Sequence, residues 1–256
     1  MLKVIALNSF RGGTGKSNIT ANLAVILAQL GHRVGVIDTD LPSPGIHIVL
    51  GLDQSTIAHT LNDYLWETCT IAEATHDVTP EGLQGDGRLF LSPASFNAED
   101  INRIVREGYD VDRLSGGINS MATELSLDFL LIDTHPGLNN ETLMSMALAD
   151  RLVIILRPDS QDFQGTAVTV DISQQLGVPR SYVLVNRVLD ALKPDHVKAL
   201  VSKTYGLPVL GILPNTDEMM LLASRSLFCL RFPSHPFSKQ LQAIAKQFLK
   251  DDGVSA

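Results

Sequence analysis

A run of Gly, Lys and Ser residues directly after the first apolar segment has the composition of a phosphate-binding loop. The stretch "RGGTGKS" spans residues 11–17 and follows "KVIAL". Its three glycines let the backbone turn tightly, so that successive N–H groups can point at phosphate oxygens. Lys16 adds a full positive charge, and the Ser17 hydroxyl is a hard oxygen ligand for Mg²⁺. The predicted nucleotide-binding residues of this loop are Arg11, Gly12, Gly13, Thr14, Gly15, Lys16, Ser17 and Asn18.

The loop departs from the common phosphate-binding pattern, in which a Gly precedes Gly-Lys-Ser by five positions. Phe10 stands where that first Gly is expected, and Arg11 lies beside it. The segment is therefore a damaged loop, a chance match, or a different device built on the same backbone. Its place between an apolar run and a helical pattern argues against chance.

Acidic residues follow two other apolar runs. Asp38 and Asp40 follow "RVGVI", and Asp133 ends "FLLID" shortly before Gly137. Asp133 can hold a Mg²⁺-bound water, and Asp40 lies in a Pro/Gly loop where a carboxylate could orient an attacking water. Asp38 either caps a turn or lies on the magnesium side of the site. The predicted metal site is therefore Ser17, Asp38 and Asp133, and Asp40, Lys16 and Arg11 are the predicted catalytic residues.

Short apolar runs alternate with segments of helical periodicity along the whole chain. The runs predict strands over residues 3–7, 33–38, 88–95, 128–133, 151–156, 181–186 and 208–213. The spacing of apolar residues predicts helices over Asn18–Leu30, Ala98–Glu107, Val111–Glu124, Asn140–Leu148, Gln164–Gln175, Pro194–Tyr205 and Ser238–Lys250. This alternation predicts one α/β domain over residues 1–256, a doubly wound, mostly parallel sheet with helices on both faces.

Ligands of such sheets bind at the carboxyl ends of the strands. The phosphate-binding loop and the acidic residues all follow predicted strands. So do two later pairs, Asn186-Arg187 and Pro214-Asn215. The sequence therefore predicts that these distant segments meet at one edge of the sheet.

Composition excludes several classes of protein. The chain has 256 residues, 45% of them hydrophobic, which is enough for a substantial core. No stretch approaches the roughly 18 apolar residues of a membrane span, and the N-terminus has no signal-peptide pattern. Cys69 and Cys229 lie far apart without a CxxC motif, so we expect a reducing, cytoplasmic environment and no metal cluster.

Charge is distributed unevenly. The formal net charge is -8, yet residues 180–250 hold ten Lys and Arg residues against four Asp and Glu residues. This basic C-terminal third could contact DNA phosphates or the anionic lipids of a membrane. The alternative is a solvated surface that offsets an acidic one.

These motifs together resemble the MinD/ParA family of ATPases with a deviant phosphate-binding loop, over nearly the whole chain. The resemblance rests on "RGGTGKS", on Asp38-Thr-Asp40, on "IDTHPG", on Asn186 and on "LGILPNTDEM"; "FLSPAS" and "NNETLMSMALAD" are closest to the MinD side. In this family no Gly is required at the position of Phe10. The resemblance implies a P-loop NTPase fold of the SIMIBI type.

The resemblance also implies function. It implies ATP and Mg²⁺ as ligands, slow hydrolysis, an ATP-dependent homodimer, and an activating partner protein. It implies that Asn186 contacts adenine and that Arg187, Pro214 and Asn215 lie on the base side of the site. It implies that the chain positions a cargo, such as the division site, a chromosome or plasmid, an organelle or polar machinery, on a membrane or nucleoid.

Arg11 departs from the family pattern. The family has a Lys here that reaches across the dimer to the partner's phosphates, whereas this chain has Arg. The charge is kept, and a guanidinium can bind two phosphate oxygens, but the two residues are not interchangeable. Arg11 therefore acts in trans, like an arginine finger, or it lines its own loop in cis.

The last predicted helix has an apolar stripe of Leu241, Ile244, Ala245, Phe248 and Leu249. MinD proteins resemble this in having an amphipathic C-terminal helix that binds membranes. Here two Asp residues follow at once and would be repelled by anionic lipid, so we expect the stripe to pack against the sheet.

Three classes of function remain open. The first is an ATP-driven dimerisation switch. The second is a metal-cluster scaffold or reductase of the same superfamily, which would need clustered cysteines that this sequence lacks. The third is a nucleotide-gated interaction module with little or no hydrolysis. Asp40, together with Lys16, Ser17 and Asp133, favours hydrolysis.

Overall fold

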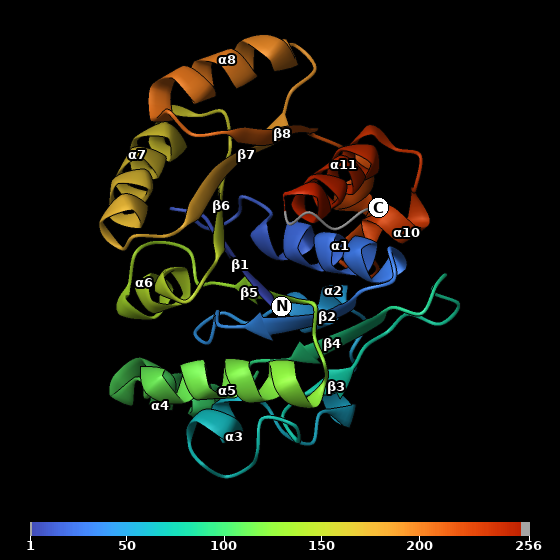
Figure 1. The fold of residues 1–256 in the computed structure, drawn as a ribbon, viewed down its shortest axis with the longest axis vertical. Coiled ribbons are helices and arrows are strands. Elements are labelled where there is room, and N and C mark those ends of the chain that lie inside the picture. Colours follow the sequence, from blue (N-terminus) through green and yellow to red (C-terminus); the bar gives the residue numbers. More distant parts are fainter. Residues whose placement is uncertain (1, 252–256) are drawn as a thin grey trace.

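The structure, a computed structural model, describes residues 2–251 and is built on one eight-stranded sheet (Figure 1). The strand order is β3-β4-β2-β5-β1-β6-β7-β8. All neighbouring strands are parallel except β3, which pairs antiparallel with β4. The strands are β1 (Lys3–Asn8), β2 (Arg33–Asp38), β3 (His76–Asp77), β4 (Arg88–Ser92), β5 (Phe129–Asp133), β6 (Arg151–Leu156), β7 (Arg180–Val188) and β8 (Val209–Pro214). The predicted doubly wound fold is confirmed.

Helices cover both faces of the sheet (Figure 1). One face packs against α1 (Lys16–Gln29), α2 (Ile46–Val49), α10 (Phe228–Arg231) and α11 (Pro236–Lys250). The other packs against α3 (Leu61–Leu65), α4 (Ala98–Glu107), α5 (Val111–Glu124), α6 (Asn140–Ala147), α7 (Ser160–Gln175) and α8 (Pro194–Tyr205). A 3₁₀ turn (Gln54–Thr56) and α9 (Asp217–Leu222) complete the elements. Two cores result, because alternate side chains of each strand point to opposite faces.

The central strands explain why the sheet is parallel. In β5 and β6 every residue is buried, and β1 and β2 are buried after their first residue. Strands that are apolar on both faces must be covered by helices, and crossover helices make neighbouring strands parallel. In the register of β2 with β5, Asp38 lies opposite Asp133, so the carboxyl ends of both strands place an acid at the same edge.

Some predicted elements differ from the observed ones. The third predicted strand, residues 88–95, ends at Ser92 as β4, because Pro93 lacks the N–H that a strand ladder needs. The helix predicted from Gln164 begins at Ser160, since Asp159 caps it by accepting hydrogen bonds from two backbone N–H groups. The short β3 and the short helices α2, α3, α9 and α10 have too few residues to give a periodic pattern.

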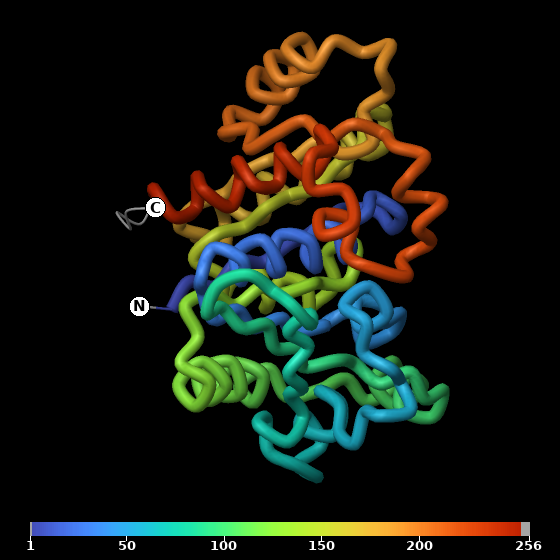
Figure 2. Tube along the Cα trace, turned by 90° about the vertical axis from the view of Figure 1, so that its right-hand side faces the viewer, coloured from blue at the N-terminus to red at the C-terminus, as the bar shows by residue number. Residues whose placement is uncertain are grey.

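The C-terminal helix packs into the core, as predicted. The five residues of its apolar stripe are all buried, against β8 and α1. Its end is held by Tyr182 Oη, which donates a hydrogen bond of 2.9 Å to Asp251, and by Arg151, whose guanidinium lies over the Phe248 ring. Figure 2 shows α11 lying along α1. The apolar face of α11 is thus covered by the protein itself.

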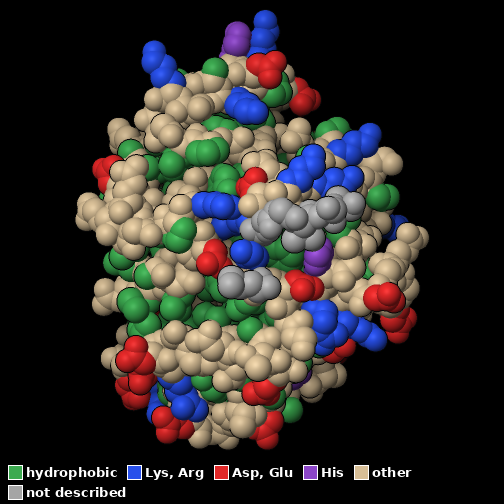
Figure 3. Space-filling view, in the orientation of Figure 1, with side chains coloured by type: hydrophobic (Ala, Val, Ile, Leu, Met, Phe, Trp, Pro, Cys, Tyr) green, Lys and Arg blue, Asp and Glu red, His purple; other side chains and the backbone are tan. Residues whose placement is uncertain are grey.

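Basic side chains of the C-terminal third lie on the outside of this layer. Lys239, Lys246 and Lys250 of α11 are exposed. Figure 3 shows Lys and Arg side chains gathered in the upper half of this face, with acidic side chains between them. Within residues 2–251, no helix has the length and apolar character needed to span a membrane.

Candidate nucleotide-binding site

The loop between β1 and α1 forms an anion-binding turn. Gly13 and Gly15 adopt positive φ angles of 79° and 90°. A side chain is also excluded at Gly15 by lack of space, because a Cβ atom at this position would lie 2.6 Å from Nδ2 of Asn186. Helix α1 begins at Lys16, so the positive end of its dipole faces the turn.

A cavity of about 400 Å³ opens above this turn and unites much of the predicted site. It is lined by Ser9, Gly12, Gly13, Thr14, Gly15, Lys16, Ser17, Asn18, Asp40, Ser43, His135, Pro136 and Arg187. The predicted phosphate-binding residues from Gly12 to Asn18 therefore meet Asp40 and Arg187 in one space. Arg11, Asp38 and Asp133 do not line it.

A smaller cavity continues from the first on the side of β7 and β8. Its lining is Gly15, Asn18, Ile19, Asn186, Arg187, Pro214, Asn215, Thr216, Met219, Met220 and Phe237. All four residues predicted for the base side are present. Asn186 also contacts the phosphate-binding loop, because its Nδ2 donates a hydrogen bond of 2.7 Å to the carbonyl of Thr14. Phe237 comes from the start of α11, and no pattern near it in the sequence indicated this role.

Lys16 forms a buried ion pair in this structure. Its Nζ lies 2.8 Å from Oδ1 of Asp133, and the two side chains are 6% and 1% exposed. Thr20 Oγ1 donates to the same carboxylate oxygen over 3.1 Å. The other oxygen, Asp133 Oδ2, is buried and has no hydrogen-bond partner. Asp133 therefore holds the ammonium group of Lys16 beside the phosphate cavity.

Asp38 is fully buried beside this pair. Burial and the charge of Asp133 raise its pKa from 3.8 to about 8. Its two oxygens accept hydrogen bonds from the backbone N–H groups of Asp40 and Gly45, over 3.1 and 3.3 Å. Asp38 thus caps the loop after β2, which is one of the two roles predicted for it. That role leaves the magnesium-side role open.

The oxygen atoms of this pocket are suited to coordinate a divalent cation. Asp133 Oδ2 is a buried acceptor without a hydrogen-bond partner, and burial together with the charge of Asp133 raises the pKa of Asp38, so a cation in this pocket would stabilise both ionised carboxylates. Carboxylate and hydroxyl oxygens are the ligands that Mg²⁺ prefers. Ser17, Asp38 and Asp133 are therefore suited to hold Mg²⁺ directly or through its waters.

Asp40 is paired with a residue outside the predicted set. Its Oδ1 lies 2.6 Å from Nδ1 of His135, in the loop after β5, and both side chains line the phosphate cavity. The loop is held in place because Thr142 Oγ1 donates to the carbonyl of His135. The only sequence signal for His135 was its position two residues after Asp133.

Arg11 points away from the cavity, toward the start of α7. Its Nη1 lies 3.5 Å from Oδ1 of Asp162 and 3.7 Å from Oδ1 of Asp159. Asp162 is buried and also accepts hydrogen bonds from Arg157. Burial opposes its ionisation, but the bonds from Arg157 dominate and lower the pKa of Asp162. Arg11 is thus engaged within its own chain, and its guanidinium is partly exposed.

Phe10 has a structural role in the deviant loop. Its ring lies over Gly165 of α7, where a Cβ atom would come within 1.9 Å of the ring. Gly is costly inside a helix, and here it makes room for Phe10. The residue in place of the first Gly therefore packs the loop against α7.

The sequence model of the CobQ/CobB/MinD/ParA nucleotide-binding domain matches residues 5–227. The chain belongs to this family. The match runs from β1 to the start of α10, so it includes the phosphate-binding loop, both acidic loops and the late strands that line the two cavities.

Individual relatives of the family agree with this assignment. The chain is 28% identical to an uncharacterized ATP-binding protein of Methanocaldococcus jannaschii, over 97% of this chain and 88% of that protein. It is 24% identical to the septum site-determining protein MinD of Thermotoga maritima, over 99% of this chain and 90% of that protein. Its fold is similar to that of MinD from Pyrococcus horikoshii in complex with Mg-ADP, with a TM-score of 0.82 and 22% sequence identity. The superposition covers 99% of this chain and 98% of that chain.

Proposed function

We propose that this chain is an ATP-binding and ATP-hydrolysing switch of the MinD/ParA type, which dimerises when it binds ATP. The observation that carries the proposal is the phosphate cavity, in which the loop from Gly12 to Asn18 meets Asp40. A phosphate-binding loop alone would support nucleotide binding. A carboxylate in the same space, from a different strand end, adds a group that can orient an attacking water.

Each residue has a distinct part in this proposal. The backbone N–H groups of the loop and Lys16 bind the β- and γ-phosphates, and adenine lies beside Asn186, Arg187, Pro214 and Asn215. Ser17, Asp38 and Asp133 would hold Mg²⁺, whose charge would stabilise the negative charge of the phosphates. Asp40 orients the attacking water.

Dimerisation supplies the last component of the proposed nucleotide site, which is Arg11 of a second copy. Arg11 is partly exposed and lies at the rim of the loop, so a second copy could receive it. In the dimer, each Arg11 leaves Asp162 and contacts the phosphates bound by the other copy. The single 1–256 unit is the switch, and an activating partner protein accelerates hydrolysis. The exposed Lys residues of the C-terminal third attach the dimer to a membrane or to DNA, where it positions a cargo inside the cytoplasm.

A second candidate is a nucleotide-gated module with little or no hydrolysis. Two side-chain contacts favour it. Asp40 is paired with His135, and Arg11 is paired with Asp162. A chain in which these contacts persist with ATP bound would bind nucleotide without turning it over.

The deciding experiment measures phosphate release and mass together. Purified chain is incubated with ATP and Mg²⁺, alone, with double-stranded DNA, or with anionic liposomes, and its molar mass is determined by light scattering. The switch predicts ATP-dependent doubling of the mass and hydrolysis that one of the two surfaces stimulates. Doubling of the mass without phosphate release under every condition supports the gated module. Monomers and no ATP binding contradict both.

A further inference from the structure

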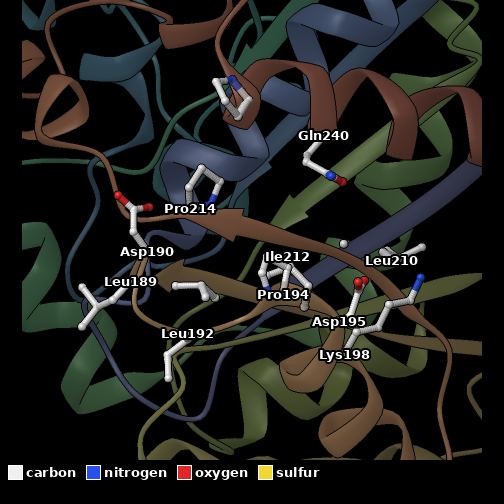
Figure 4. A pocket seen from close by; sticks show the side chains of 13 residues that line it. Leu189, Asp190, Leu192, Pro194, Asp195, Lys198, Leu210, Ile212, Pro214 and Gln240 are labelled. Carbon is white, nitrogen blue, oxygen red and sulfur yellow. The ribbon is translucent and has the colours of Figure 1, made fainter.

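A groove lies at the edge of the sheet opposite β3. The proposed nucleotide site accounts neither for its acidic charge nor for its shape. It has a volume of about 410 Å³ and follows β8, the last strand of the sheet among the described residues. Figure 4 shows Leu210 and Ile212 along this strand, with Gln240 of α11 on one side and Lys198 of α8 on the other. Among residues 2–251, β7 is the only strand that pairs with β8, so the outer edge of β8 has no strand beside it.

The edge of β8 is suited to main-chain pairing. An edge strand presents unpaired N–H and C=O groups, to which an extended segment of another chain can add as a further strand. Apolar side chains beside the edge are exposed: Leu189 is 56% and Leu192 is 38% exposed. Both lie in the connection between β7 and α8, at one end of the groove (Figure 4).

Acidic side chains gather at this groove. Residues 180–250 contain four acidic residues, Asp190, Asp195, Asp217 and Glu218. Asp190 and Asp195 line the groove, and an adjoining hollow that shares Asp190 with it is lined by Asp217 and Glu218. All four acids of a basic segment thus lie along one continuous surface. Of the ten Lys and Arg residues in the segment, Lys198 alone lines it.

We propose that this groove binds an extended, basic peptide segment of a partner protein, which adds to the sheet beside β8. Lys or Arg side chains of the segment face Asp190 and Asp195 on the α8 side of β8, and the apolar side chains between them point to the α11 side, toward Leu210 and Pro236. Alternate residues of a strand point to opposite sides, so the segment has basic and apolar residues in alternation.

The charge of the groove argues against other occupants. DNA and anionic lipid would be repelled by four carboxylates. A second copy of this chain that paired through its own β8 would place the same acids against one another, and like charges facing across an interface are unfavourable. A basic polypeptide can both form main-chain hydrogen bonds with the free edge of β8 and pair with the acidic side chains.

The test uses the full chain without nucleotide, so its outcome does not depend on the proposed ATPase activity. Binding of a fluorescent ten-residue peptide of alternating Lys and Val is measured by anisotropy at low ionic strength. The matched probe alternates Glu and Val. We expect the Lys peptide to bind and the Glu peptide not to bind. Amide hydrogen exchange should slow in residues 209–214 on addition of the Lys peptide.

Two pairs of substitutions distinguish this groove from general attraction to an acidic protein. Asp190→Asn with Asp195→Asn should weaken binding of the Lys peptide by about three- to tenfold, as expected for two exposed charge pairs. Glu124→Gln with Asp171→Asn removes the same charge from exposed positions on α5 and α7 and should leave the affinity unchanged. Circular dichroism checks that all variants are folded.

Four results overturn the proposal. One is absence of binding by the Lys peptide at low ionic strength. Another is equal weakening by both pairs of substitutions, which would indicate attraction to the net charge alone. The third is slowed exchange outside residues 209–214 with none inside them, which would place the peptide elsewhere. A shift to dimers through β8, seen by light scattering without peptide, would identify a second copy as the occupant and also contradict it.

Discussion

Oδ1 of Asp40 lies 2.6 Å from Nδ1 of His135, and the two side chains reach this contact from loops that follow different strands. Asp40 comes after β2 and His135 after β5, and both line the phosphate cavity. A carboxylate that must orient a water needs a fixed direction. In the proposed mechanism, the contact with His135 gives Asp40 this direction.

His135→Ala should therefore lower kcat for ATP hydrolysis by about tenfold with little change in ATP affinity, because a misdirected carboxylate affects the transition state more than binding. His135→Asn should restore part of kcat, since its Nδ2 can take the place of the ring Nδ1. Steady-state kinetics and calorimetry give the two values. An alanine variant with unchanged kcat would show that the pair has no part in turnover.

Asp40→Ala should bind ATP but turn it over at a small fraction of the wild-type rate, and so accumulate as a dimer. The reason is that the variant keeps the loop and Lys16 but lacks the group that orients water. Light scattering with ATP and Mg²⁺ measures the dimer. A variant that stays monomeric, or that hydrolyses at the wild-type rate, rules this role out.

Lys16→Ala should abolish tight ATP binding, because Lys16 is the full charge that the loop can place on the β- and γ-phosphates in cis. The structure adds a second effect. Removal of Lys16 leaves Asp133 buried without its cation, and breaking a buried pair in this way costs about 3–5 kcal/mol of unfolding free energy.

Combining Lys16→Ala with Asp133→Asn separates the two effects. The double variant should recover most of the lost stability, since no buried charge is left unpaired, yet still fail to bind ATP tightly. Urea unfolding measures the first and calorimetry the second. Wild-type ATP affinity in folded Lys16→Ala protein would contradict the phosphate-binding assignment of the loop.

Arg11→Ala should bind ATP as a monomer but lose ATP-dependent dimerisation and hydrolysis together, and Arg11→Lys should restore both in part. The physical reason is that Lys16 and the loop N–H groups remain, whereas the charge offered to the second copy is lost. Equilibrium binding, light scattering and phosphate release measure the three properties.

Mixing Arg11→Ala with Lys16→Ala chains tests the trans role directly. A mixed dimer has one intact nucleotide site facing a partner that still carries Arg11, so some activity should return. If mixed dimers form and remain inactive, Arg11 acts in cis only.

Asp38 should make the stability of the nucleotide-free chain depend on pH. Burial and Asp133 raise its pKa to about 8, whereas an unfolded Asp titrates near 3.8. Between these values the folded chain holds a proton that the unfolded chain has lost. The unfolding free energy should therefore fall as pH rises from about 4 to 8, with a contribution on the order of 1 kcal/mol per pH unit.

Asp38→Asn removes this titration and should flatten the fall, and the exposed Asp171→Asn should not. Urea unfolding without Mg²⁺ between pH 5 and 8 measures both slopes. Parallel slopes for Asp38→Asn and the wild type would show that Asp38 does not hold the proton.

The amino-acid sequence by itself determined the architecture and the loops that carry the chemistry. Apolar runs such as "FLLID" and the glycines of "RGGTGKS" have strong local signals, because a strand buried on both faces must be apolar and a tight phosphate-binding turn needs positive φ angles. The carboxyl ends of parallel strands meet at one edge, so the position of Asp40 close to the loop also followed from the order of elements.

Only the tertiary structure decided the partners of these residues. The pairs Lys16–Asp133, Asp40–His135 and Arg11–Asp162 each join residues 95 to 151 positions apart in the chain. Their contacts depend on strand register and on side-chain directions that no local pattern encodes. The same holds for the acidic groove at β8, since four acids scattered between positions 190 and 218 become one surface only when β7, β8 and α8 are packed together.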